Sequence, residues 1–250
     1  NTSIDIDLSV DPEMLGRIFE NLLAEINPET GKTARKSTGS YYTPRPVVEY
    51  MVDSSLKHYF EVKTKIESKK ISYLLDNSVE DSGLTPDEEQ QVESALFNLK
   101  ILDPACGSGA FPMGILQKIL MILQKVDHNA EKSVEQVLNT IIDPIKRDLL
   151  KRKLELAHLI DDRDFNDYAR KLNLIQRSIY GIDIQPIAVE ISKLRFFLSI
   201  IVDEVIQDDT PNRGIESLPN LEFKFVCANS LIPLPKENKW EKLFGDTNII

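Results

Sequence analysis

Residues 101–111, Ile-Leu-Asp-Pro-Ala-Cys-Gly-Ser-Gly-Ala-Phe, constrain the fold of this chain more than any other segment. Two apolar residues predict the end of a strand, with Asp103 at its tip. Gly107 and Gly109 then predict a tight loop, because glycine tolerates a positive φ and lets a ligand approach the backbone closely. The apolar run over 110–126 predicts a buried helix. A strand, glycine loop and helix in this order bring backbone N–H groups and a helix N-terminus against a ligand.

Strands and helices alternate along the chain. Strands are predicted at 100–103, 178–183 and 221–227. Helices are predicted from Asp11 and Pro12 to about Ile26, over about 47–60, from a capping box at Thr85 to about Asn98, over 110–126, within 128–176 and over 187–205. This alternation predicts an α/β fold with a doubly wound, mostly parallel sheet, which binds ligands at the carboxyl ends of its strands.

Two regions are expected. Residues 1–98 form an N-terminal helical region that contains a Tyr-Thr-Pro motif, and residues 99–250 form the α/β domain, with a helical insertion at about 128–176. The 250 residues suffice for a substantial core.

Composition narrows the possible partners and compartment. The net charge is −10, which argues against a self-sufficient nucleic-acid binder. Four basic residues nevertheless gather around one glycine-bearing loop, which either contacts a DNA backbone or is a solvated loop. These are Lys32, Arg35, Lys36 and Arg45. The two cysteines lie far apart, and neither they nor the three histidines have the spacing of metal ligands. Without a visible signal peptide or apolar spanning segment, we expect a reduced, cytoplasmic protein and no membrane partner.

Three further polar residues occupy positions typical of ligand binding. Asp183 ends the strand Tyr-Gly-Ile-Asp-Ile and can accept hydrogen bonds from ribose hydroxyls, or can cap the next helix. Asn229, in Ala-Asn-Ser-Leu, can read an adenine amine at the same sheet edge, or can form a turn. Thr43 precedes Pro44 and can bind a carboxylate with its hydroxyl, or can simply begin a helix.

Four motifs occur together in one order: Tyr-Thr-Pro-x-x-Val-x-x-Met-Val, Asp-Pro-Ala-Cys-Gly-Ser-Gly, Tyr-Gly-Ile-Asp-Ile and Ala-Asn-Ser-Leu. Over roughly residues 11–235 this set resembles the cofactor-binding part of adenine-N6 DNA methyltransferases, especially fused restriction–modification enzymes. The resemblance implies the Rossmann-like S-adenosylmethionine-dependent methyltransferase fold, here incomplete. It also implies double-stranded DNA as a partner, contacted mainly through regions beyond this chain.

The resemblance also implies a role for each motif residue. Thr43 would hold the methionine carboxylate, and Asp183 would bind the ribose hydroxyls. Ile184 would lie against the adenine ring, and Asn229 would lie near the adenine amine. Asp103 and the loop after it would hold the methionine amino group and the sugar. That loop comprises Pro104, Ala105, Cys106, Gly107 and Gly109.

The chain departs from the family in one respect. The catalytic tetrapeptide expected there, Asn-Pro-Pro-Tyr or Asp-Pro-Pro-Tyr, is absent, because no Pro-Pro dipeptide occurs in the chain. We therefore expect a fragment that binds cofactor weakly and does not methylate DNA. A non-catalytic assembly module with the same fold is the alternative. A nicotinamide-dependent oxidoreductase is disfavoured, because the third glycine is missing and Asp183 lies much further from the loop than the roughly 20 residues usual there.

Overall fold

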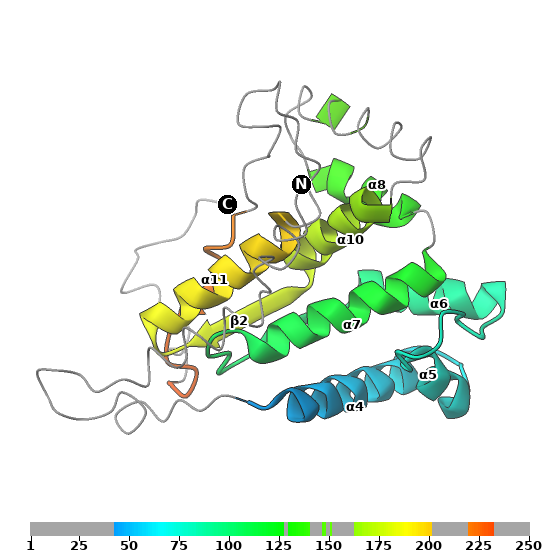
Figure 1. The fold of residues 1–250 in the computed structure, drawn as a ribbon, viewed down its shortest axis with the longest axis horizontal. Coiled ribbons are helices and arrows are strands. Elements are labelled where there is room, and N and C mark those ends of the chain that lie inside the picture. Colours follow the sequence, from blue (N-terminus) through cyan, green and yellow to red (C-terminus); the bar gives the residue numbers. More distant parts are fainter. Residues whose placement is uncertain are drawn as a thin grey trace, which may run out of the picture.

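The computed structural model describes residues 43–127, 130–140, 147–148, 151, 163–201 and 220–232. The expected first helix, the basic residues Lys32, Arg35 and Lys36, and the loop that enters the third strand lie outside these residues. The described residues include ten helices and strands, labelled as in Figure 1. They are α4 (Arg45–Lys63), α5 (Ser68–Leu74), α6 (Pro86–Phe97), β1 (Ile101–Asp103), α7 (Ala110–Val126), α8 (Glu131–Thr140), α10 (Arg163–Arg177), β2 (Ile179–Asp183), α11 (Pro186–Ile201) and β3 (Phe225–Cys227).

The three strands form a parallel sheet in the order β1-β2-β3. Asp103 at the end of β1 pairs with Gly181, and Asp183 at the end of β2 pairs with Cys227. All three carboxyl ends therefore lie at one edge of the sheet, as the sequence predicts. The fold is mixed α/β.

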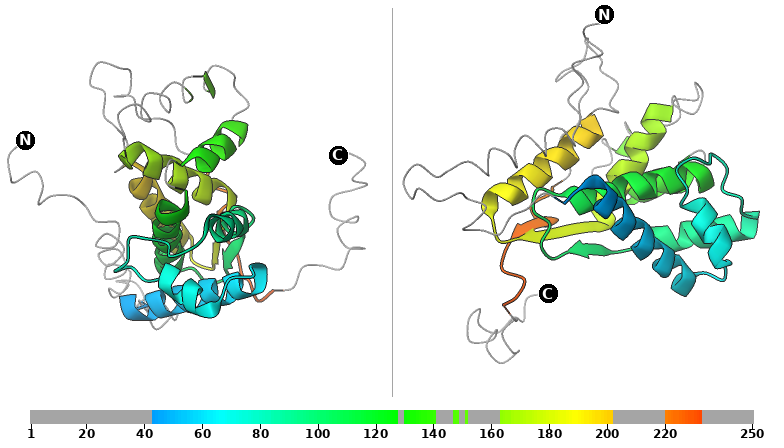
Figure 2. Two further views of the ribbon diagram at one scale, coloured as in Figure 1. Left: turned by 90° about the vertical axis from the view of Figure 1, so that its right-hand side faces the viewer. Right: turned by 60° about the horizontal axis from the view of Figure 1, so that its bottom comes forward.

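Helices α7, α10 and α11 contact β2, and α11 also contacts β3. They cover the face of the sheet on which Ile179 and Phe225 are buried, and Figure 2 shows α11 lying along the strands. Leu102 and Val226, on the other face, are 57% and 41% exposed. The described part of the chain thus has helices on one face only, and does not show the expected double winding. The reason is the strand order, because right-handed crossovers that all proceed in one direction place their helices on the same side.

Local sequence signals account well for the helices. Helix α7 has the predicted bounds, and α6 begins with the predicted capping box, in which Glu88 accepts a hydrogen bond from the Thr85 N–H at 2.8 Å and returns its own N–H to the Thr85 hydroxyl. Helix α5 was not predicted from sequence, because its seven residues are too short to reveal a helical period.

The third strand is shorter than predicted. Residues 222–224 form a turn rather than its first half, since Leu221 accepts hydrogen bonds from the N–H groups of both Lys224 and Phe225. The side chain of Asn220 also accepts from the Glu222 N–H at 3.0 Å and stabilises this turn. The apolar residues 221 and 223 wrongly suggested that the strand begins at Leu221. Phe223 is 80% exposed and lies in the turn.

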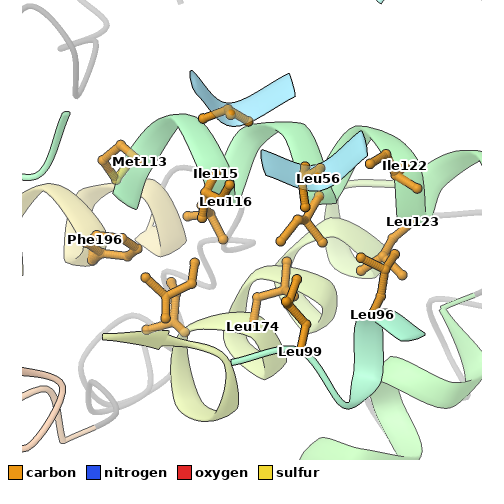
Figure 3. Close-up of a cluster of buried hydrophobic side chains, with 14 of the residues drawn as sticks. Leu56, Leu96, Leu99, Met113, Ile115, Leu116, Ile122, Leu123, Leu174 and Phe196 are labelled. Carbon is orange, nitrogen blue, oxygen red and sulfur yellow. The ribbon is translucent and has the colours of Figure 1, made fainter. Parts of the chain in front are cut away.

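The core gathers around α7, which packs against α4, α6 and α10 (Figure 3). Leu116, Ile119 and Ile122 in α7 are at most 1% exposed, and Leu56 and Leu174 contribute from α4 and α10. Gly114 permits close packing there, because a Cβ at this position would lie 2.6 Å from a Val48 methyl group. Helix α4, which begins just after Thr43, is thereby fixed beside the helix that follows the glycine loop.

Two buried lysines on α7 hold the turn after α5. Lys118 donates to the Leu75 carbonyl at 3.0 Å and pairs with Asp53 at 2.8 Å. Lys125 donates to the carbonyls of Leu74 and Asp76 at 3.0 and 2.8 Å. Because buried ammonium groups are costly unless they are bonded in this way, both lysines serve the fold. No helix among the described residues is long and apolar enough to cross a bilayer.

Candidate functional site

The glycine loop leaves β1, turns back toward β2 and then begins α7. The Cys106 N–H donates to the Ile182 carbonyl at 2.9 Å, and the Gly109 N–H donates to the Cys106 carbonyl at 2.8 Å. Gly107 and Gly109 have φ angles of +54° and +84°, so both adopt the left-handed conformation that favours glycine. Gly109 is the N-cap of α7, where it has no side chain to occupy the helix N-terminus.

Asp183 joins this loop to the second strand. Its Oδ2 accepts a hydrogen bond from the Gly107 N–H at 2.8 Å, and its Oδ1 accepts one from the Gln185 N–H at 2.8 Å. The second contact fits the helix-entry role, because Gln185 immediately precedes α11. The first contact was not foreseen from the sequence, and it brings together two motifs that lie 76 positions apart. A carboxylate with two such bonds still has lone pairs to offer a ligand.

A second carboxylate and a thiol lie beside Asp183. Burial raises the pKa of Asp103, the Ala105 N–H bonded to it acts in the opposite direction, and the Asp183 charge raises the pKa further. Burial, together with both carboxylates, raises the pKa of the Cys106 thiol to about 12. Cys106 is therefore a poor nucleophile, since the thiolate is the reactive form. Both cysteines are free thiols, and no group of His, Cys, Asp or Glu within the described ranges could hold a metal ion.

The raised pKa of Asp103 predicts a stability effect with a definite sign. A carboxyl whose pKa is higher in the folded than in the unfolded state costs stability as pH rises through the raised pKa. Asp103→Asn should therefore raise the melting temperature at neutral pH, and the gain should shrink as the pH falls toward the ordinary aspartate pKa. Differential scanning calorimetry from pH 3.5 to 8 measures this.

Asp76→Asn is the matched control for that measurement. Hydrogen bonds from Ser78 lower the pKa of the exposed Asp76, so this variant should lose stability at neutral pH instead. A melting temperature of Asp103→Asn that stays at or below that of the unaltered chain across the whole pH range would contradict the assigned desolvation.

Asn229 lies just beyond β3, near the ends of the other two strands. Its neighbour Ala228 donates its N–H to the Asp183 carbonyl at 3.0 Å, and the hydroxyl of Ser230 donates to the Pro104 carbonyl at 2.8 Å. The Asn229 side chain accepts from the Leu231 N–H at 3.0 Å, which is the turn that the sequence offered as an alternative. The Asn-Ser segment therefore crosses from the third strand to the glycine loop.

Thr43 and Ile184 are the two remaining predicted site residues. Thr43 is half-buried and precedes Pro44, the N-cap of α4. A cleft of about 250 Å³ is lined by residues from the beginnings of both α4 and α7, Arg45 and Ala110 among them, so Thr43 lies toward the same end as the glycine loop (Figure 1). Ile184 is 60% exposed, which leaves its side chain accessible to a ligand. No described contact joins Thr43 to Asp183.

Helix α11 contributes two residues that sequence reasoning missed. Ser192 donates its hydroxyl to the Gly107 carbonyl at 2.9 Å, and Arg195 donates from Nη1 to the Ser108 carbonyl at 2.8 Å. Ser192 is fully buried and Arg195 is 4% exposed. Polar residues inside a mostly apolar helix were the available signal, because such groups are buried only where they find partners.

One curated protein is similar to this chain over most of its length. A protein of Methanocaldococcus jannaschii named "Putative type II restriction enzyme and methyltransferase" is 29% identical over 241 residues, which cover 93% of this chain. The two proteins are distant homologues. The chain spans 17% of that protein's length. No family model and no solved structure matches the chain.

Proposed function

We propose that this chain is the S-adenosylmethionine-binding portion of a site-specific DNA adenine-N6 methyltransferase from a restriction–modification system. The observation that carries the proposal is the hydrogen bond from the Gly107 N–H to Asp183, which unites the glycine loop with the acidic strand end. The distant homologue named as a restriction enzyme and methyltransferase supports the same reading. The adenine-N6 assignment rests on the resemblance carried by the four motifs.

The residues at this sheet edge suit such a cofactor chemically. S-adenosylmethionine contains a ribose, an adenine, a carboxylate, an ammonium group and a positively charged sulfonium. Asp103 and Asp183 supply negative charge and acceptors, and the N-terminus of α7 supplies positive partial charge. A Cβ at Gly107 would meet no atom within 4 Å, so this side of the loop has room for a ligand.

The role proposed for each residue follows from its chemistry. Asp183 accepts bonds from the ribose hydroxyls with its remaining lone pairs, Asp103 binds the ammonium group and Thr43 binds the carboxylate. Residues 104–107 and Gly109 bring their backbone against the sugar and methionine. Ile184 packs on the adenine ring, and Asn229 lies near its amine. When bound, the cofactor supplies an activated methyl group.

Isothermal titration calorimetry of the 250-residue chain tests the proposal. We expect saturable, one-to-one binding of S-adenosylmethionine and of its demethylated product S-adenosylhomocysteine, with no binding of NAD. Circular dichroism on the same sample controls for folding. If a folded sample binds neither nucleoside, the proposed function is wrong, and binding of NAD alone would favour the oxidoreductase reading instead.

A tritium-transfer assay on unmethylated DNA examines the chemistry separately. We expect no transfer by this chain, because the tetrapeptide that would grip a flipped adenine is absent from its sequence. Positioning of reactants accounts for roughly 7–11 kcal/mol of a barrier, so its loss removes measurable turnover. Methylation by this chain would show that the catalytic groups lie within these 250 residues.

A further inference from the structure

Helix α11 packs against the glycine loop and contacts it through two residues that lie outside the four motifs. The hydroxyl of Ser192 bonds the Gly107 carbonyl, and the Arg195 guanidinium bonds the Ser108 carbonyl. Asp183, at the end of the strand that leads into α11, bonds the Gly107 N–H. One strand–helix unit therefore fixes both polar groups of Gly107 and the carbonyl of Ser108.

Packing at Gly109 reinforces these hydrogen bonds. A Cβ at Gly109 would lie 2.9 Å from the Ser192 hydroxyl oxygen and 3.3 Å from its Cβ. The loop therefore lies directly against Ser192, and any side chain at Gly109 would push it away. Ser108 itself is 4% exposed, so its carbonyl needs the bond that Arg195 provides.

This arrangement also sets the direction of the N–H groups in the loop. In a trans peptide the C=O and the following N–H point in opposite directions. Because the carbonyls of Gly107 and Ser108 face α11, the N–H groups of Ser108 and Gly109 are turned away from that helix. The conformation of the loop is thus fixed before any ligand arrives, and a site fixed in advance binds more tightly because less ordering remains to be done on binding.

We propose that Ser192 and Arg195 are positioning residues that pre-organise residues 107–109 for a nucleoside cofactor. This inference rests on the proposed function for its ligand, S-adenosylmethionine or S-adenosylhomocysteine. Neither side chain needs to touch the cofactor. Each acts through a loop carbonyl, and its removal lets the loop sample conformations that do not bind.

The test compares Ser192→Ala with Ser199→Ala in the 250-residue chain. Ser199 is a buried serine on the same helix, and its hydroxyl bonds the Phe196 carbonyl within that helix at 2.7 Å. We expect Ser192→Ala to weaken S-adenosylhomocysteine binding by about 3- to 10-fold, as the loss of one hydrogen bond implies. Ser199→Ala should leave affinity unchanged.

Amide hydrogen exchange measured without cofactor provides a second readout. Exchange at residues 107–110 should accelerate in Ser192→Ala and stay unchanged in Ser199→Ala. Arg195→Lys should repeat the pattern against Arg170→Lys, since Arg170 is an equally buried arginine that bonds the Asp127 carbonyl away from the loop.

The outcomes separate the two proposals. Faster exchange with weaker cofactor binding, confined to the Ser192 and Arg195 variants, supports the positioning role. Unchanged exchange overturns it, and so does faster exchange with unchanged affinity. If the unaltered chain binds no nucleoside cofactor, the proposed function fails, while the exchange measurement still decides whether α11 organises the loop.

Discussion

Replacing Asp183 with alanine should weaken S-adenosylhomocysteine binding by about 100-fold or more. The carboxylate holds the Gly107 N–H at 2.8 Å, and its remaining lone pairs are proposed to accept the ribose hydroxyls. Hydrogen bonds to a charged acceptor are worth about 1.5–3 kcal/mol each, so two of them suffice for this loss. Titration calorimetry of both forms measures the affinity.

Asp76→Ala is the matched control for this variant. Asp76 also accepts a hydrogen bond from the N–H two residues later, that of Ser78 at 2.8 Å, but it lies in the turn after α5. It should lose a similar local contact with no change in cofactor affinity. If Asp183→Ala is folded and binds as tightly as the unaltered chain, Asp183 serves only the entry to α11, and the assigned ribose contact is incorrect.

Gly181→Ala should destabilise the fold by about 1–3 kcal/mol, the usual cost of overpacking a close-packed core. Gly181 lies in the central strand, where an added Cβ would approach the Phe225 ring to 2.7 Å and the Cys106 sulfur to 2.9 Å. Phe225 is fully buried, and its ring centroid lies 4.7 Å from that of Phe196, so it has little room to move. Chemical denaturation measures the loss.

A second substitution tests the stated cause. Phe225→Val removes both ring atoms that the new Cβ would meet, Cδ1 and Cε1, so Gly181→Ala should cost less stability in that background than in the unaltered chain. A double-mutant cycle expresses this difference as a coupling energy. Equal costs in both backgrounds would show that the Phe225 ring is not the obstacle.

The elements that sequence predicted best carry their own local signals. The apolar run that forms α7 is long enough to define a buried helix, and the Thr85 capping box specifies where α6 begins. The glycines at 107 and 109 indicated positive φ angles, which both residues adopt. Each signal depends on residues within a few positions of one another, and so can be read without the fold.

Elements with weaker local signals were missed or misplaced. Helix α5 buries Ile71 and Leu74, but its seven residues are too few for this spacing to be distinguished from that of a loop. The apolar residues before β3 suggested strand, but the backbone there closes on the Leu221 carbonyl instead. The helices of the described residues cover one face of the sheet rather than two. No local pattern could predict this, because the order of the strands depends on their pairing.

For the candidate site, the sequence alone predicted the glycine loop and the carboxylates of Asp103 and Asp183. It also predicted that these two residues and Asn229 lie at one edge of the sheet. The second prediction follows from the parallel arrangement, because the carboxyl ends of parallel strands lie at the same edge of the sheet. Only the tertiary structure decided that Asp183 binds Gly107 directly and that α11 holds the loop through Ser192 and Arg195. These contacts join residues 76 to 87 positions apart, and such pairs are selected by packing and by the need of buried polar groups for partners, which no local pattern records.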